Sequence, residues 1–326
     1  MPVILSKNPI KSPFWLPEGH TQSIYPALFR KVLLTQLPFR ERLNTDDGDF
    51  LDVDWYVNQG GIDKNPLLII SHGLEGSSDR QYVKGLIHVM QSEGYNILAW
   101  NYRSCSGEIN RALRFYHSGA TDDLDFIIRF AHSRGANHIL LAGFSLGGNL
   151  TLKWAGEQGE NPPYFIRKAV AFSVPLHLSS SSQQLTRREN SLYTHRFLQT
   201  LLEKVTEKSA RYPQDITPSM LSAIGSLYDF DDVITGPLHG FKDAEDYYEQ
   251  NSSLYFLDRI RVPTLVVNAK NDPFLSQECL PEAVQSDHVQ IELPKQGGHC
   301  GFYPQNYRGE TWSEQRAARW FKEIEI

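Results

Sequence analysis

The sequence has few cysteines, no strong excess of one charge and no long hydrophobic run. Its 326 residues include three cysteines, Cys105, Cys279 and Cys300, with no paired spacing. This pattern argues against a disulfide framework and against a zinc site built from paired cysteines, and it favours a reducing compartment. Of all residues, 40% are hydrophobic and 21% are charged, which is ordinary for a globular protein.

The charge and hydropathy patterns exclude further classes of protein. The net charge is −6 at pH 7, and the basic residues form no stripe, which argues against nucleic acid as a partner. The longest apolar runs, such as residues 66–70, are far shorter than the roughly 20 residues that span a bilayer. The N-terminus lacks the basic start and long apolar region of a signal peptide. We therefore expect a cytoplasmic protein without stable membrane insertion.

Apolar segments of strand length alternate with helical segments from about residue 50 onward. Because these strands are uniformly apolar and separated by helices, they predict a mostly parallel sheet covered by helices on both faces. Residues 33–57 alternate more strictly between polar and apolar and indicate an antiparallel hairpin at the sheet edge. In the helix predicted after Ala120, Thr121 is the expected cap, and Asp122 and Asp123 lie in the first turn. The other predicted strands lie at 65–73, 95–103, 137–145, 165–175, 262–273 and 288–294, and the predicted helices at 80–94, 120–135 and 147–159.

Residues 178–260 interrupt this rhythm because they contain no convincing strand. The run SSSSQQ near their start predicts a flexible polar loop, and Thr217 and Pro218 are typical of a helix start. The following apolar residues share one helical face: Leu198, Leu201, Leu202 and Val205. We predict one domain over residues 1–326, with an N-terminal arm at about 1–32 and a helical cap insertion at about 178–260.

The motif Gly143-Phe144-Ser145-Leu146-Gly147 follows a predicted strand and opens a predicted helix. In this context a G-x-S-x-G sequence is typical of a serine nucleophile, because small residues two positions away let strand and helix approach closely. The alternative is a simple glycine-rich turn. We therefore expect Ser145 to be a nucleophile.

A serine hydroxyl needs a base and an orienting acid to become a good nucleophile. His299, in the glycine-rich segment KQGGHCGF, is the expected base, with His72 as its rival. Asp272 follows an apolar strand and precedes a proline, so it is either a turn residue or the orienting carboxylate. The chain order of serine, acid and histidine favours the second role.

The segment SHGLEGSS follows the strand predicted at 65–73. Its glycines allow backbone N–H groups to turn inward. We expect the N–H groups of Leu74 and Leu146 to form an oxyanion hole, with His72 holding the loop. A plain glycine turn is the alternative.

These motifs together resemble the α/β-hydrolase superfamily, and more closely its YheT-like branch of hydrolases and esterases. The resemblance rests on GFSLGGN, SHGLEGS, NYRSCSG, EGHTQSIYP, NDP and GGHCGF and covers nearly the whole chain. It implies an α/β-hydrolase fold and triad roles for Ser145, Asp272 and His299. Ser104 departs from the family's usual glycine. His20 and Arg103 either bind substrate or support the structure, and we favour support. Cys300 is expected to be a packing residue.

The predicted activity is therefore hydrolysis of carboxylic esters through an acyl-enzyme, with no metal and no organic cofactor. The expected substrate is a small-molecule ester or a lipid-like ester with a short to medium acyl chain, covered by the cap insertion. An acyltransferase with the same triad, and a non-catalytic binding protein of the same fold, are the alternatives.

Overall fold

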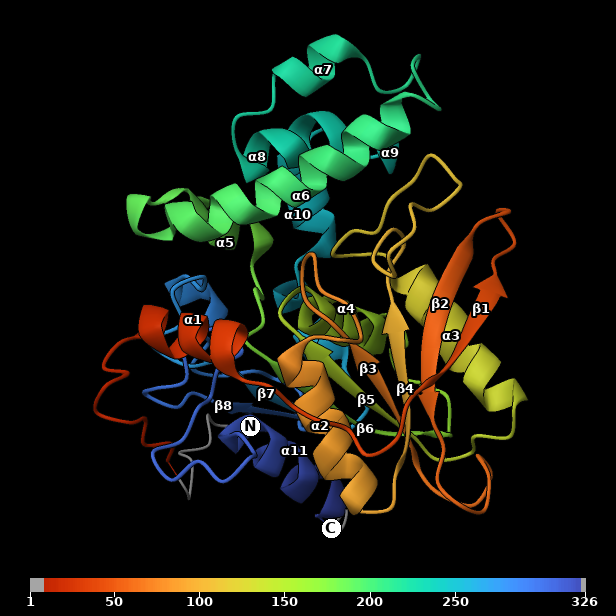
Figure 1. The fold of residues 1–326 in the computed structure, drawn as a ribbon, viewed down its shortest axis with the longest axis vertical. Coiled ribbons are helices and arrows are strands. Elements are labelled where there is room, and N and C mark those ends of the chain that lie inside the picture. Colours follow the sequence, from red (N-terminus) through yellow and green to blue (C-terminus); the bar gives the residue numbers. More distant parts are fainter. Residues whose placement is uncertain (1–8, 324–326) are drawn as a thin grey trace.

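The computed structural model describes residues 9–323, so residues 1–8 of the expected N-terminal arm lie outside the described residues. Its centre is an eight-stranded sheet in the order β1-β2-β4-β3-β5-β6-β7-β8 (Figure 1). The strands are β1 (Phe39–Asn44), β2 (Phe50–Tyr56), β3 (Leu67–Ser71), β4 (Asn96–Asn101), β5 (Ile139–Phe144), β6 (Ile166–Phe172), β7 (Thr264–Val267) and β8 (Val289–Glu292). Strands β3 to β8 pair in parallel, which confirms the predicted mostly parallel sheet.

The predicted hairpin is also present. Strand β1 pairs with β2 in antiparallel register, and β2 pairs with β4 in the same way. Of the two hairpin strands, only β1 lies at an edge of the sheet, because β2 pairs with β1 on one side and with β4 on the other. Every residue of β2 is buried. The polar residues of β2 are tolerated there because Asp52 and Asp54 accept hydrogen bonds from Arg42 and Arg40 on β1.

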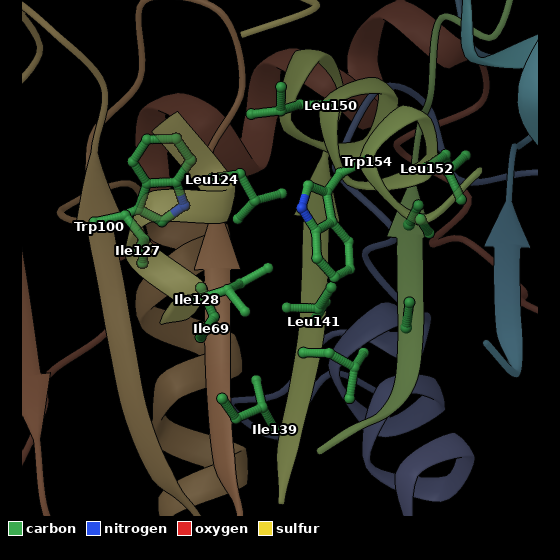
Figure 2. Packing of buried hydrophobic residues seen from close by; sticks show 14 of the residues in the cluster. Ile69, Trp100, Leu124, Ile127, Ile128, Ile139, Leu141, Leu150, Leu152 and Trp154 are labelled. Carbon is green, nitrogen blue, oxygen red and sulfur yellow. The ribbon is translucent and has the colours of Figure 1, made fainter. Parts of the chain in front are cut away.

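Both faces of the sheet are covered, and successive strand residues therefore belong to different cores. In β3, Leu67 and Ile69 lie in one hydrophobic cluster, and Leu68 and Ile70 lie in the other. Helices α3 (Thr121–Ser133) and α4 (Leu146–Glu157) contribute to the first cluster, whereas α2 (Gln81–Ser92) and α11 (Trp312–Lys322) contribute to the second. Figure 2 shows the first cluster, in which residues of β3, β4 and β5 meet Leu124, Ile127, Ile128, Leu150 and Trp154.

The covering helices follow the sequence pattern, with one correction. In α2, which lies within the helix predicted at 80–94, the apolar residues Val83, Leu86, Ile87 and Met90 are all buried. Helix α3 is capped by Ala120, without a side-chain bond, and Thr121 is its first residue. The prediction that Thr121 caps α3 was therefore wrong by one position. Helix α1 (Gly19–Phe29) lies in the expected N-terminal arm.

Residues 178–260, the expected cap insertion, are helical, and Figure 1 shows α5 to α9 above the end of the sheet to which the parallel strands point. They comprise α5 (Leu178–Thr186), η1 (Arg188–Asn190), α6 (Ser191–Ser209), α7 (Pro218–Ser222), α8 (Leu227–Phe230), η2 (Asp231–Thr235), α9 (Gly236–Leu238), α10 (Ala244–Asn251) and η3 (Ser253–Arg259). A short 3₁₀ turn, η4 (Gln277–Cys279), follows β7. Thr217 caps α7 as predicted, since its side chain accepts a hydrogen bond from Met220 N–H.

The prediction of a flexible loop at SSSSQQ was wrong, because these residues form most of α5. The side chain of His177 accepts from Ser180 N–H at the start of the helix. Ser181 and Ser182 are buried, and their hydroxyls bond to Cys279 and Tyr248. Tertiary partners thus satisfy the serine side chains that would otherwise compete with the helix backbone.

No helix within residues 9–323 is long and apolar enough to cross a bilayer.

Arg103 joins the hairpin to helix α3. Its side chain is only 2% exposed and lies between the buried carboxylates of Asp49 and Asp123, at 2.8 and 2.7 Å. Asp47, which is more exposed, lies 2.9 Å away. The resemblance left open whether Arg103 binds substrate, and these contacts are those of a buried structural residue. The neighbouring Ser104 has φ +66, which explains why a glycine suits this position.

We expect Arg103→Met to lower the free energy of unfolding by about 3–5 kcal/mol, because it leaves two buried carboxylates without a cation. Urea unfolding of the variant and the wild type measures the difference. Arg129→Met is the control, because it removes only the exposed pair with Asp125 and is expected to cost less than about 1 kcal/mol. Equal stability of Arg103→Met and wild type would contradict the assigned role.

Candidate active site

Ser145 stands at the junction of β5 and α4 in a strained backbone conformation. Its φ of 54° and ψ of −120° are unfavourable for a residue with a side chain. A Cβ on Gly143 would lie 2.3 Å from the Gly147 carbonyl oxygen, and a Cβ on Gly147 would lie 2.3 Å from the carbonyl oxygens of Ser71 and His72. Both positions therefore require glycine, and the close approach of strand and helix holds Ser145 at the turn.

The three residues predicted as a triad form one hydrogen-bonded chain. The Ser145 hydroxyl lies 2.9 Å from Nε2 of His299. On the other side of the ring, Nδ1–H donates to the Asp272 carboxylate at 2.9 and 3.1 Å. The Asp272 side chain is fully buried and that of His299 is 12% exposed. The structure thus brings together residues that are up to 154 positions apart in the sequence.

The charges around the hydrogen-bonded residues Ser145, His299 and Asp272 favour a proton on the His299 ring. Burial by itself lowers the pKa of His299, but the Asp272 carboxylate beside the ring raises it, and the net direction is upward. An imidazole that takes the serine proton becomes a cation, and a buried carboxylate stabilises that cation. The Asp272 carboxylate also accepts from Phe274 N–H at 2.9 Å, which holds its orientation.

Helix α1 supports the loops that carry Asp272 and His299. The sequence motifs did not predict this support. The side chain of Gln22 is completely buried. Its Oε1 accepts from Asn271 Nδ2 at 2.9 Å and from Gly297 N–H at 2.8 Å. Asn271 is one position before Asp272, and Gly297 is two positions before His299. Ser23 Oγ accepts from His299 N–H at 2.7 Å. The segment EGHTQSIYP contributes to the family resemblance, but nothing in its composition indicates these long-range partners.

The loop after β3 lies directly against Ser145. A Cβ on Gly73 would lie 3.2 Å from the Ser145 Cβ, and the Tyr82 hydroxyl accepts from Gly73 N–H. The N–H groups of Leu74 and Leu146, the expected oxyanion donors, have no acceptor within residues 9–323. Both amides are therefore available to a negatively charged oxygen beside Ser145.

Glu75, which follows Leu74, is anchored on three sides. Its φ is 51°, and its N–H donates to the Tyr116 hydroxyl at 3.0 Å. Its carboxylate accepts from Lys204 of α6 at 2.7 Å and from Tyr116 at 2.7 Å. Its carbonyl oxygen accepts from Arg80. These contacts hold the Leu74–Glu75 peptide and connect it to the 178–260 segment.

Within residues 9–323, neither His72 nor His20 forms a hydrogen bond with Ser145, and their rings have other partners. Burial lowers the pKa of His72 to about 3, so its ring is neutral, with Nδ1 bonded to the Gly73 carbonyl and Nε2 accepting from Tyr102 N–H. His20 stacks on Tyr193 of α6 and lies 3.3 Å from its hydroxyl. Cys300 packs against the second hydrophobic cluster and its N–H donates to Ser173.

A cavity of about 510 Å³ opens beside the serine. Ser145, His299 and Leu74 belong to its wall, together with side chains from α1 and from the 178–260 segment. Apolar side chains form a large part of this wall, and polar ones such as Arg80, Arg196 and Thr200 lie among them. The apolar side chains include Ile24, Leu28, Leu178, Leu185, Phe197, Leu201, Leu227 and Phe230. Its volume is typical of a site for a small organic ligand. Across the described range of the chain, no group of three or more His, Cys, Asp or Glu side chains is arranged to hold a metal ion.

Comparisons with known proteins agree with this fold. The family model described as alpha/beta hydrolase fold matches residues 66–305. A protein of Escherichia coli (strain K12) named "Putative esterase YheT" is 34% identical over 306 residues, which are 92% of this chain and 89% of that protein. The "Phospholipase ABHD3" of Mus musculus is 29% identical over 88% of this chain and 71% of that protein.

Solved structures show the same fold. The Pyrococcus furiosus esterase Pf2001 superposes with a TM-score of 0.56 at 16% identity, over 90% of this chain and 97% of that one. At this identity the likeness concerns the fold alone. The family model and the bacterial relative together show that this chain belongs to the α/β-hydrolase family, in its YheT-like branch.

Proposed function

We propose that this protein is a serine hydrolase of carboxylic esters that works through an acyl-enzyme. The observation that carries the proposal is the hydrogen-bonded chain from Ser145 through His299 to Asp272 at the wall of an apolar cavity. Relatives named as an esterase and as a phospholipase support ester chemistry. Three free cysteines support the cytoplasm as its proposed compartment.

In the proposed first half-reaction, Ser145 Oγ attacks the acyl carbonyl carbon while its proton passes to Nε2 of His299. Asp272 stabilises the resulting imidazolium, and the N–H groups of Leu74 and Leu146 donate to the oxyanion. As the tetrahedral intermediate collapses, His299 gives its proton to the departing alcohol oxygen, and the acyl group remains bonded to Ser145.

In the second half-reaction, water attacks the acyl-enzyme and its proton passes to Nε2 of His299. The second tetrahedral intermediate collapses, the carboxylic acid leaves and the same proton returns to Ser145 Oγ. The apolar part of the cavity wall favours a hydrocarbon acyl chain over a polar acyl chain. The volume of the cavity suits short to medium chains. We propose that the 178–260 segment acts as a cap over this chain.

We expect wild type to hydrolyse p-nitrophenyl esters in a series from acetate to palmitate, with an optimum at short to medium length. Ser145→Ala should lose on the order of 10⁶ in kcat, because no nucleophile remains. Initial rates across the series measure both. Ser133→Ala, on an exposed serine of α3, is the control and should keep full activity. Equal rates in Ser145→Ala and wild type would refute the assignment, and alkyl esters formed in added alcohol would instead indicate acyl transfer.

Asp272→Asn should lower kcat by on the order of 10⁴, because the amide no longer holds the required tautomer of His299. The acid limb of kcat/KM should also move to lower pH. The reaction needs neutral His299. The Asp272 carboxylate raises the pKa of that ring, and the variant loses this contribution while burial continues to lower the pKa. pH–rate profiles measure the shift, with exposed Asp287→Asn as the control. An acid limb that stays in place would contradict this electrostatic role.

Gln22→Leu should lower kcat by about 10- to 100-fold with little change in KM, because small displacements of catalytic groups are costly. The variant releases Asn271 and Gly297, which flank the acid and the histidine, and it touches no substrate atom in the proposed mechanism. Steady-state kinetics on the best ester measure the split. Exposed Gln315→Leu on α11 is the control. An unchanged kcat would show that Gln22 does not position the triad.

A further inference from the structure

The cavity contains one cluster of polar side chains that the proposed mechanism does not use. This polar cluster consists of Asp231, Thr235, Tyr248 and Ser182, and all four residues line the cavity. They come from three separate elements: Asp231 and Thr235 from η2, Tyr248 from α10 and Ser182 from α5. In Figure 1 the helices α8 and α9, which flank η2 in sequence, lie above the sheet and away from the junction of β5 and α4 that holds Ser145.

Hydroxyl groups hold the Asp231 carboxylate in place. Thr235 Oγ1 donates to Oδ1 at 2.7 Å, and the Tyr248 hydroxyl donates to Oδ2 at 2.7 Å. The Tyr248 oxygen also lies 3.0 Å from Ser182 Oγ. A carboxylate offers about four acceptor positions, so these two bonds leave each oxygen with capacity for a further donor.

Asp231 has no positive partner in the part of the chain that the structure describes. Within residues 9–323 no lysine, arginine or histidine forms an ion pair with it. Besides burial, only the hydrogen bonds from the Thr235 and Tyr248 hydroxyls shift its pKa, and they lower it. Burial raises the pKa of Asp231 to about 6, so the group is still mostly a carboxylate at neutral pH. Glu75, the other carboxylate in the cavity wall, differs because Lys204 neutralises it.

The local backbone is also unusual. Asp231 to Thr235 form a π-helical turn, which brings Thr235 onto the Asp231 carboxylate. Such turns are rare and frequently occur at functional sites. The turn therefore arranges acceptor groups along a cavity whose other walls are largely apolar.

A plain alkyl chain suits the apolar wall but not this cluster. An alkyl group placed against Asp231 would remove water from the carboxylate and return no hydrogen bond, which is unfavourable. A hydroxyl or ammonium group would satisfy the free acceptor positions, and sites built to bond such a donor discriminate strongly against substrates that lack it.

We propose that the polar cluster is a specificity subsite, and that the preferred substrate is an ester with a hydrogen-bond donor, hydroxyl or ammonium, remote from the reacting carbonyl. This inference rests on the proposed ester hydrolysis and specifies its substrate class. Asp231 is the specificity-determining residue, and Thr235 and Tyr248 hold its carboxylate.

The test compares matched esters that differ only in the donor. One series contains p-nitrophenyl esters of linear C4 to C8 acids ending in methyl, hydroxyl or ammonium, which probes a donor on the acyl chain. The other contains hexanoate monoesters of butanol, 1,3-propanediol and 3-aminopropanol, followed by titration of released acid, which probes a donor on the alcohol. Wild type is expected to prefer a donor-bearing ester by about 10- to 100-fold in kcat/KM in one series.

Asp231→Asn should reduce that preference about tenfold or more while leaving kcat/KM on the matched plain ester within about threefold. The asparagine side chain has nearly the same shape as the aspartate side chain, so hydrogen bonds to Thr235 and Tyr248 remain possible. Asp232→Asn is the matched control, because it makes the same change of charge at the next residue, whose carboxylate bonds to Ala244 N–H and does not line the cavity. This control should keep the wild-type preference.

The outcomes separate the subsite from the reaction. Preference for ammonium or for hydroxyl identifies which donor the cluster binds. Hydrolysis of plain esters by wild type with no preference for any donor overturns the subsite and leaves the proposed function standing, and this result needs no variant to fold. A preference that survives in Asp231→Asn also overturns it. No hydrolysis in either series overturns both.

Discussion

The site depends on the absence of space around Ser145. Strand β5 and helix α4 approach so closely that neither Gly143 nor Gly147 has room for a Cβ. The same approach forces Ser145 into the left-handed region, with φ at 54°. As a result the serine side chain projects from the turn, and the first amide of α4 is left without an acceptor in the described structure. Backbone packing thus sets the position of the proposed nucleophile and leaves free one of the two proposed oxyanion donors.

Segments remote in sequence hold the remaining groups around that turn. Helix α1 supports the acid and histidine loops through Gln22 and Ser23. Helix α6 reaches the loop after β3 through Lys204 and Glu75. The same helix contacts α1 where Tyr193 stacks on His20. The proposed catalytic groups therefore lie on loops whose positions are set by a rigid sheet and by two helices from other parts of the chain.

The cavity combines two environments that favour different parts of one substrate. Its apolar walls suit a hydrocarbon chain, because burying such a chain removes apolar surface from water. The Asp231 carboxylate lies in the same cavity and has no ion-pair partner within residues 9–323, so that region suits a donor and not a hydrocarbon. Fold alone does not distinguish the esters that members of this family cleave. Side chains from the 178–260 segment contribute much of the wall, and this segment is where substrate choice is expected to reside.

Local sequence was sufficient for the sheet and for the serine turn. The uniformly apolar runs predicted parallel strands, because a strand buried on both faces has no polar side, and the order Ser145, Asp272, His299 indicated which side chains would meet. The polar run SSSSQQ predicted a loop, and this prediction was wrong because helix α5 depends on partners such as Tyr248 and Cys279 that lie far along the chain.

The roles of Gln22 and Asp231 likewise had no local signal. A glutamine that joins two loops about 250 and 275 residues away, and a carboxylate left without a cation, are defined only by what surrounds them. Sequence by itself determined the strands, the serine turn and the choice of candidate triad residues, because backbone preference and residue chemistry are local properties. Tertiary structure alone decided which polar groups are buried, paired or left open to a ligand, because burial and charge pairing depend on neighbours that only folding brings together.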